Sequence, residues 1–102
     1  MPIAQHESRR INLLALRIAG GVALHALERD LVGQIERTYN DLIDLVHDIN
    51  APVTPQRATD IRHAVGDLID AWGWQDDASA DDVMRDVPRL LDMLAEAGGH
   101  AA

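Results

Sequence analysis

The chain has 102 residues, of which 47% are hydrophobic and only 3% aromatic, and it contains neither cysteine nor phenylalanine. This length suits a single domain over residues 1–102, the aliphatic composition favours helix packing over a β-sandwich, and the lack of cysteine excludes disulfides, thiol catalysis and cysteine-ligated zinc. The formal net charge of −8 argues against broad binding to nucleic acid or to an anionic membrane, because both would repel the chain.

The charge is distributed unevenly along the chain. Residues 1–40 contain five arginines and four acidic residues, whereas residues 41–102 contain four arginines and thirteen acidic residues. We therefore expect the second half to offer an acidic surface to a basic protein partner. Asn12 and Arg17 interrupt the apolar run that follows Arg9 and Arg10, which argues against a signal peptide or a spanning helix. We expect no nucleic-acid partner, no membrane partner and a cytoplasmic location.

The first predicted element is one long helix over about residues 5–49. Its apolar residues recur at the α-helical period of about 3.6 residues without a phase slip. Gly20-Gly21 weakens this helix locally, since each glycine costs about 1 kcal/mol relative to alanine. Two alternatives remain: a single helix bent at the glycines, or two helices that meet there. The apolar stripe consists of Leu13, Leu16, Gly20, Leu24, Leu27, Leu31, Ile35, Tyr39, Leu42, Val46 and Ile49.

A second apolar stripe in the first half of this helix predicts self-association. A continuous helix would be about 68 Å long, at 1.5 Å per residue, and the rest of the chain is too short to cover it. We therefore predict a dimer or higher oligomer formed through residues 11–31. In the alternative, the helix breaks at Gly20-Gly21, folds back and covers itself. The predicted interface residues are Ile11, Leu14, Ile18, Val22, Leu24, Leu27, Leu31 and Trp74.

Two further helical regions follow a proline-containing turn at residues 50–55. Thr54 is a typical N-cap and Pro55 a typical first helical residue, so a second helix is predicted over 55–72, ending at Gly73. A third region over 79–97 is predicted to kink or split near Pro88, and residues 98–102 are predicted to fray. The fold class is all-α: a helical bundle of one long and two or three shorter helices, completed by self-association.

Trp74 follows the predicted end of the second helix. Two interpretations remain open for its side chain. It either folds over the core, as large aromatics usually do, or anchors an interface, a position in which tryptophan is enriched.

The tetrapeptide Asp-Leu-Ile-Asp occurs twice, at 41–44 and 67–70. Each copy places two carboxylates on one helix face, and four such carboxylates could hold Mg²⁺. The segment 36–72 resembles the MazG-like all-α nucleotide pyrophosphohydrolases, which bind magnesium through paired acids on successive helices. The resemblance implies a site formed by Asp41, Asp44, Asp67 and Asp70, although Ala64 stands where the family has a glutamate. About 1.7 such aspartate pairs are expected by chance in this chain, which favours solvated helix edges instead.

Two Asp-x-x-His pairs, Asp44 with His47 and Asp60 with His63, are interpreted as surface pairs. The sequence therefore predicts a small acidic helical protein–protein interaction module without catalytic residues or cofactor, such as an adaptor, an inhibitor or a phage or plasmid accessory protein. The alternative is a degenerate MazG-like magnesium-dependent nucleotide pyrophosphohydrolase.

Overall fold

A computed structural model describes residues 5–73 and 81–99, which form four α-helices and no strand. The predicted all-α class is therefore confirmed. The helices are α1 (Gln5–Glu28), α2 (Val32–Val46), α3 (Pro55–Trp72) and α4 (Asp81–Gly99).

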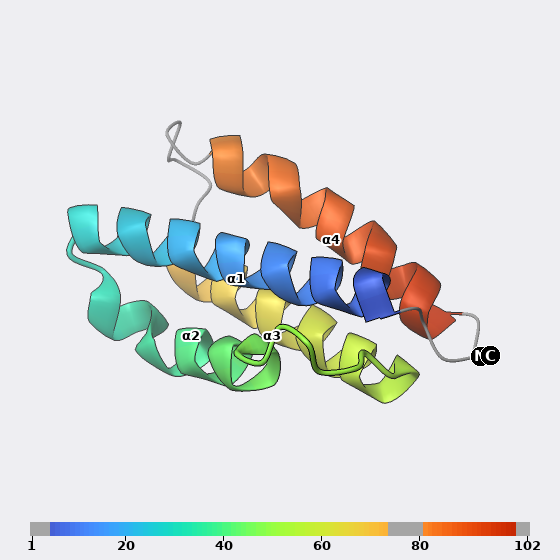
Figure 1. Cartoon of the computed structure of the whole chain (residues 1–102). Helices are drawn as coiled ribbons and strands as arrows, with labels where there is room; N and C mark the ends of the chain where they lie inside the picture. The colour runs from blue at the N-terminus through green and yellow to red at the C-terminus, as the bar shows by residue number, and fades with distance from the viewer. Residues whose placement is uncertain (1–4, 74–80, 100–102) are drawn as a thin grey trace.

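The four helices form a bundle in which each helix runs antiparallel to the next one along the chain (Figure 1). α1 packs against α2 and α4, and α3 packs against the same two helices, so that α1 and α3 are diagonal across the core. The groove between α1 and α4 and the groove between α2 and α3 therefore lie on opposite sides of the bundle.

The predicted long helix over residues 5–49 is wrong, because the chain reverses direction after Glu28. Asp30 adopts a left-handed conformation with φ of 59°. The amide of Leu31 donates to the Ala26 carbonyl at 2.7 Å, and the amide of Asp30 donates to the Leu27 carbonyl at 3.3 Å. This pair of hydrogen bonds is a Schellman motif, which ends a helix, and aspartate tolerates the left-handed conformation better than most residues. The helix passes through Gly20-Gly21 without a break.

The break removes the original reason for predicting an oligomer. Since α1 and α2 are separate and antiparallel, the chain covers its own core, as the fold-back alternative stated, but the reversal lies at Asp30 and not at the glycines. Self-association is therefore not required to bury the core, and any case for it depends on what the bundle leaves exposed.

The face that α1 buries is also different from the predicted leucine stripe. Its buried apolar residues are small or β-branched, whereas Leu13, Leu24 and Leu27 remain exposed. Small residues allow the helix axes to approach closely. A Cβ atom at Gly21 would lie 2.5 Å from Cγ2 of Val83, so glycine is needed where α1 meets α4. The buried apolar residues of α1 are Ile11, Ala15, Ile18, Ala19, Val22 and Ala26.

Polar side chains of α1 hold the connection between α2 and α3. The Asn12 side-chain amide is fully buried and donates to the carbonyls of Ile49 and Ala51 at 3.1 and 3.0 Å. The buried hydroxyl of Ser8 accepts a hydrogen bond from the Val53 amide at 3.0 Å. These bonds give hydrogen-bond partners to backbone groups of a partly buried connection. Asn12, which interrupts the apolar run of the sequence, is thus part of the folded interior.

α3 spans the range that the sequence predicts. The Thr54 side chain accepts a hydrogen bond from the Arg57 amide, Pro55 opens the helix, and Gly73 closes it with φ of 66°. At its last turn the Trp72 ring is buried and stacks on His25 of α1, with ring centroids 5.6 Å apart. The Gln34 side chain of α2 donates to the Ala71 carbonyl. The end of α3 is thereby tied to both α1 and α2.

α4 is one helix that contains Pro88, so the chain does not split there, and a kink at Pro88 stays a prediction. The helix ends at Gly99, two residues beyond the predicted range of 79–97. The exposed position of Pro88 keeps its ring out of the core. Trp74, Ser79 and residues 100–102 lie outside the described residues.

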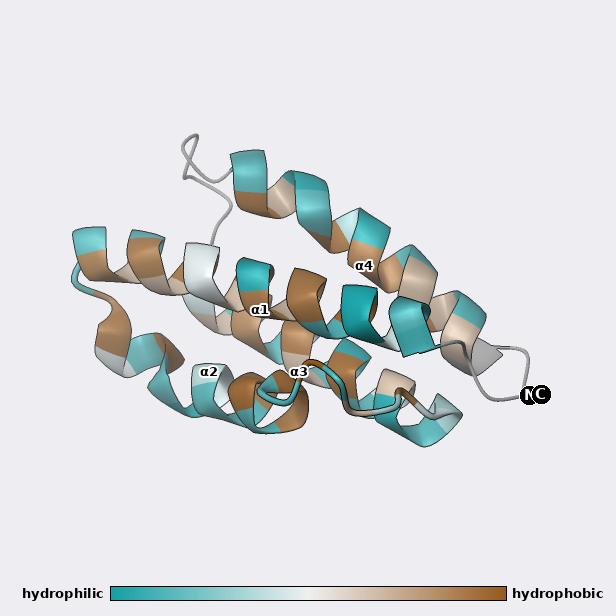
Figure 2. Cartoon of the chain, in the orientation of Figure 1, coloured by the Kyte–Doolittle hydropathy of each residue, from teal (hydrophilic) through white to brown (hydrophobic). Residues whose placement is uncertain are grey.

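α1 is long and apolar enough to span a membrane by length and composition alone. Core helices of soluble proteins meet the same criterion, and α1 packs against all three other helices. Figure 2 shows hydrophobic residues on α1 with hydrophilic residues between them.

Candidate interaction surfaces

The α1–α2 groove is an apolar hollow at the surface of the bundle. It has a volume of about 420 Å³. Leu27 on its α1 side is 67% exposed and Val32 on its α2 side is 44% exposed, while the buried Ile35 side chain lies beneath them. Leu24, one turn before Leu27, is 56% exposed. The groove is lined by Ala23, Leu27, Val32, Ile35, Glu36, Tyr39 and Asn40.

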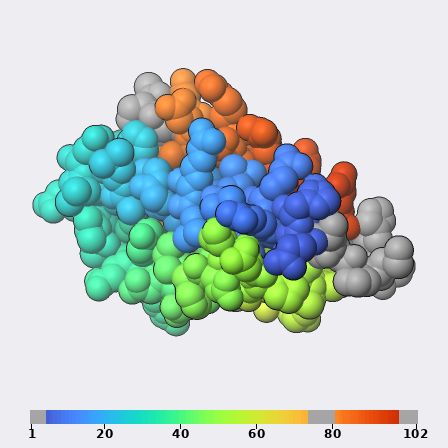
Figure 3. Space-filling view, in the orientation of Figure 1, coloured from blue at the N-terminus to red at the C-terminus, as the bar shows by residue number. Residues whose placement is uncertain are grey.

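The local turn explains why these side chains are exposed. The chain reverses through only three residues between α1 and α2, so Leu27 and Val32 lie close to the turn, at one end of the bundle. That end is at the left of the space-filling view, where α1 passes into α2 (Figure 3). Large apolar side chains that remain in water at one place, rather than scattered, are typical of protein-binding surfaces.

The predicted interface residues that the structure describes separate into three groups. Ile11, Ile18 and Val22 are fully buried within the bundle and are therefore not available to a partner in this structure. Leu14 and Leu31 are half-buried against the core. Leu24 and Leu27 are exposed, and their role in an interface stays a prediction. Val32 is not among the predicted interface residues, because in the predicted continuous helix it lies outside the leucine stripe.

The two Asp-Leu-Ile-Asp segments face each other only in part. Asp41 of α2 and Asp67 of α3 line one hollow of about 190 Å³, together with Thr38, Asp60, His63 and Ala64. Asp44 and Asp70 do not line it. Leu42 and Leu68 are fully buried, so each segment contributes a leucine to the core and aspartates to the surface.

The acidic side chains of this α2–α3 groove lie apart from one another. Within residues 5–73 and 81–99, no three His, Asp or Glu side chains lie close enough together to hold one metal ion. The four aspartates of the two segments are exposed. Exposed carboxylates on neighbouring helices are well solvated, and they give this side of the bundle its negative charge.

A third hollow, the α1–α4 groove, lies on the opposite side of the bundle and combines basic and apolar side chains. It has a volume of about 220 Å³ and is lined by Arg10, Leu13, Leu14, Arg17, Arg89 and Met93. The sequence pattern alone does not predict this site, because its α1 and α4 side chains are at least 72 positions apart, the separation of Arg17 and Arg89.

No protein-family model, curated protein or solved structure matches this chain. The function is therefore inferred from the three grooves and their chemistry.

Proposed function

We propose that this protein is a small acidic helical protein–protein interaction module that self-associates through the α1–α2 groove. The observation that carries the proposal is the exposure of Leu27 and Val32 at one apolar hollow, with Leu24 exposed one turn before Leu27. Each of these side chains would lose contact with water in a complex, which contributes about 25 cal/mol for each Å² of apolar area buried. These side chains do not contribute to the buried core of the bundle, so the fold of one chain does not explain their exposure.

A second copy of the chain fits this surface for a geometric reason. In a two-fold symmetric interface the same patch serves both partners, so the patch must contain projections and hollows together. Leu27 projects from α1, and the adjacent hollow is floored by the smaller Ala23 and by Ile35. One copy's leucine can therefore enter the other copy's groove.

Charge also favours this end of the molecule for contact between identical chains. Two copies with a net charge of −8 repel each other, and the repulsion is strongest where the acidic residues of α2, α3 and α4 gather. Around the α1–α2 groove the acids Glu28, Asp30 and Glu36 are nearly balanced by Arg29 and Arg37. The copies can approach here at a lower electrostatic cost than at the α2–α3 groove.

Sedimentation velocity over a dilution series from millimolar to micromolar protein tests this function. We expect a species of about twice the 11.2 kDa monomer mass, dissociating on dilution. Leu27→Asp should leave a monomer, because it places a charge where the partner's apolar surface must lie. Leu13→Asp is the matched control: the same change on the same helix, at a residue that is 44% exposed but does not line this groove. A wild-type monomer at every concentration would refute self-association.

The acidic α2–α3 groove is the surface that we assign to a basic protein partner. Asp41, Asp60 and Asp67 are exposed side by side on two helices, an arrangement that suits arginine or lysine side chains. An Asp41→Asn/Asp67→Asn variant should then bind such a partner less tightly without changing its own oligomeric state.

Magnesium-dependent nucleotide hydrolysis is a second candidate, supported by the single observation that Asp41 and Asp67 share one hollow. The hollow of about 190 Å³ is smaller than the roughly 300–1,000 Å³ typical of ligand pockets. A metal that binds only the native state raises the melting temperature. A melting temperature that rises with millimolar Mg²⁺ in the wild type but not in Asp67→Asn would favour this candidate, and an unchanged value would remove its support.

A further inference from the structure

The α1–α4 groove has an apolar floor and a basic rim in a protein that is otherwise acidic. Leu13, Leu14 and Met93 form the apolar part, and Leu13 is 44% exposed. Arg10, Arg17 and Arg89 surround them. The three guanidinium groups come from both helices, so the positive charge borders the groove on its α1 side and on its α4 side.

One buried carboxylate positions two of these arginines. The Asp86 side chain is only 6% exposed, and its oxygens lie 3.1 Å from Nε of Arg17 and 3.8 Å from Nη1 of Arg89. Both arginine side chains nevertheless remain more than 60% exposed. A single carboxylate shared by two guanidinium groups leaves one net positive charge there. The ion pair therefore fixes the direction of two arginines without neutralising them.

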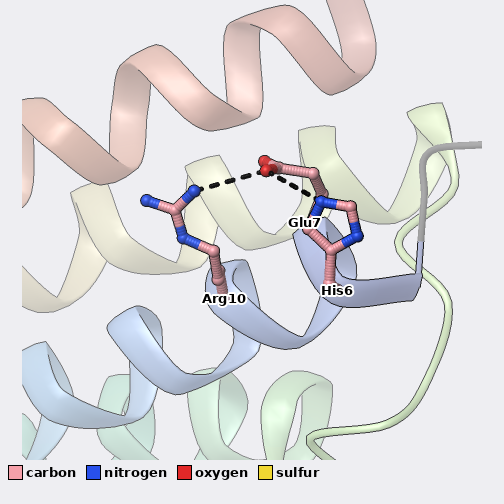
Figure 4. Close-up of polar contacts among 3 residues, drawn as sticks. All are labelled: His6, Glu7 and Arg10. Carbon is pink, nitrogen blue, oxygen red and sulfur yellow. Dashed lines mark hydrogen bonds and ion pairs between the residues drawn. The ribbon is translucent and has the colours of Figure 1, made fainter.

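Arg10 has a partner that is easily exchanged. Figure 4 shows Glu7 between His6 and Arg10, with its Oε1 atom 3.3 Å from Nη1 of Arg10 and 3.7 Å from Nε2 of His6. The side chains of His6 and Arg10 are 77% and 62% exposed. Ion pairs this exposed contribute little to stability, so an incoming carboxylate competes with Glu7 on nearly equal terms.

We propose that the α1–α4 groove is a docking site for an acidic amphipathic helix of another protein. Apolar residues at one face of such a helix would pack on Leu13, Leu14 and Met93. Glutamate or aspartate residues flanking that face would pair with Arg10, Arg17 and Arg89, whose planar guanidinium groups bind carboxylates through two parallel hydrogen bonds. A groove between two helices that accepts an amphipathic third helix is a common mode of peptide recognition.

Charge complementarity selects this occupant over longer polyanions. Nucleic acid and anionic membranes extend well beyond a groove of this size and would meet the acidic residues elsewhere on the bundle. A short acidic helix presents its charges only where the arginines lie. The site is also separate from the α1–α2 groove, so the module would bind itself with one surface and a different protein with another.

Fluorescence anisotropy with two labelled synthetic helices tests the proposal. The first carries leucines at i, i+3, i+4 and i+7 with glutamates on both flanks, and the second has every glutamate replaced by glutamine. We expect the acidic helix to bind the full-length protein, more tightly at low salt, and the glutamine helix to bind about tenfold more weakly or worse. Amide chemical shifts should change along α1 and α4 on binding.

Variants locate the site. Arg10→Gln/Arg89→Gln should weaken binding of the acidic helix by about tenfold or more, since two charge-assisted contacts are lost. Arg37→Gln/Arg62→Gln makes the same change in net charge at exposed arginines outside the groove and should leave binding unchanged. Leu13→Asp should weaken binding while Leu27→Asp does not, the reverse of their effects on self-association. Failure of one proposal is therefore distinguishable from failure of the other.

Several results would overturn the proposal. The proposal is wrong if the acidic helix does not bind at millimolar protein, or if both helices bind equally. It is also wrong if both double arginine variants lose the same affinity for the acidic helix. Binding of duplex DNA or phosphatidylglycerol vesicles with the same arginine dependence, in place of the acidic helix, would assign the groove to a different class of partner.

Discussion

The inner face of α1 carries small and β-branched side chains, whereas its outer face carries leucines. Toward the core the helix presents Ala15, Ala19 and Ala26 among its buried residues, and at Gly21 it has no side chain at all. Toward solvent it presents Leu13, Leu24 and Leu27. A helix whose only role was to fill a core would place its leucines inside, where each would stabilise the fold most. The small inner residues bring the other helices close, and the outer leucines are available for binding.

The largest effect on stability is expected at the inner face, at Asn12. Asn12→Ala removes the donor that the carbonyls of Ile49 and Ala51 share, and each buried group left without a partner costs about 1–3 kcal/mol. We expect the free energy of unfolding to fall by about 3 kcal/mol, measured by urea denaturation. Exposed Asn40→Ala is the matched control and should change it by less than about 0.5 kcal/mol. Equal losses in the two variants would show that the residue 48–53 connection does not depend on α1.

Gly21→Ala should have a smaller but clear cost at the same face. The added methyl group meets Val83 at 2.5 Å, so α4 must shift away from α1, and overpacking of this kind costs about 1–3 kcal/mol. Gly20→Ala is the internal control, because open space surrounds that position and alanine favours the helix by up to about 1 kcal/mol. Thermal melts of the two variants should therefore shift in opposite directions. A stabilised Gly21→Ala protein would mean that α4 does not pack on α1 as described.

Leu27→Ser at the outer face should have the smallest effect on the stability of the monomer. The side chain is 67% exposed, so its loss should change the free energy of unfolding by less than about 0.5 kcal/mol at concentrations where the protein is monomeric. Association should nevertheless weaken, since truncating one of the few central residues that dominate an interface costs about 2 kcal/mol or more. Chemical denaturation of dilute protein, paired with sedimentation of concentrated protein, separates the two effects. A large loss of monomer stability would show that Leu27 belongs to the core.

The helical class and the course of α3 could be predicted from sequence because local signals determine them. Thr54, Pro55 and Gly73 mark the ends of α3 without reference to the rest of the chain. The reversal at Asp30 could not be predicted from periodicity, since apolar spacing reports which positions share a face and not whether the helix continues. The charged sequence Glu28-Arg29-Asp30 was the available signal, and its aspartate supplies the left-handed residue.

The residues that line each groove could not be predicted from the sequence, because they come together only in the tertiary fold. The leucine stripe was predicted from its helical period, whereas the fold buries the face of α1 that carries alanine and β-branched residues. Asp41 and Asp67 were correctly expected on neighbouring helices, but their partners in the hollow are Asp60 and His63 rather than Asp44 and Asp70. The α1–α4 groove joins residues from opposite ends of the chain, and only the tertiary fold brings Arg89 beside Arg17.

The central claim, that the outer face of α1 and the start of α2 bind a second copy, is tested most directly by intermolecular paramagnetic relaxation. Because the chain has no cysteine, Asn40→Cys provides a single site for a nitroxide label at the rim of the α1–α2 groove. The labelled protein, without ¹⁵N, is mixed with unlabelled ¹⁵N protein. We predict broadening of amides in residues 23–28 and 32–36 of the ¹⁵N copy. No broadening, or broadening confined to the α2–α3 or α1–α4 groove, would contradict the claim.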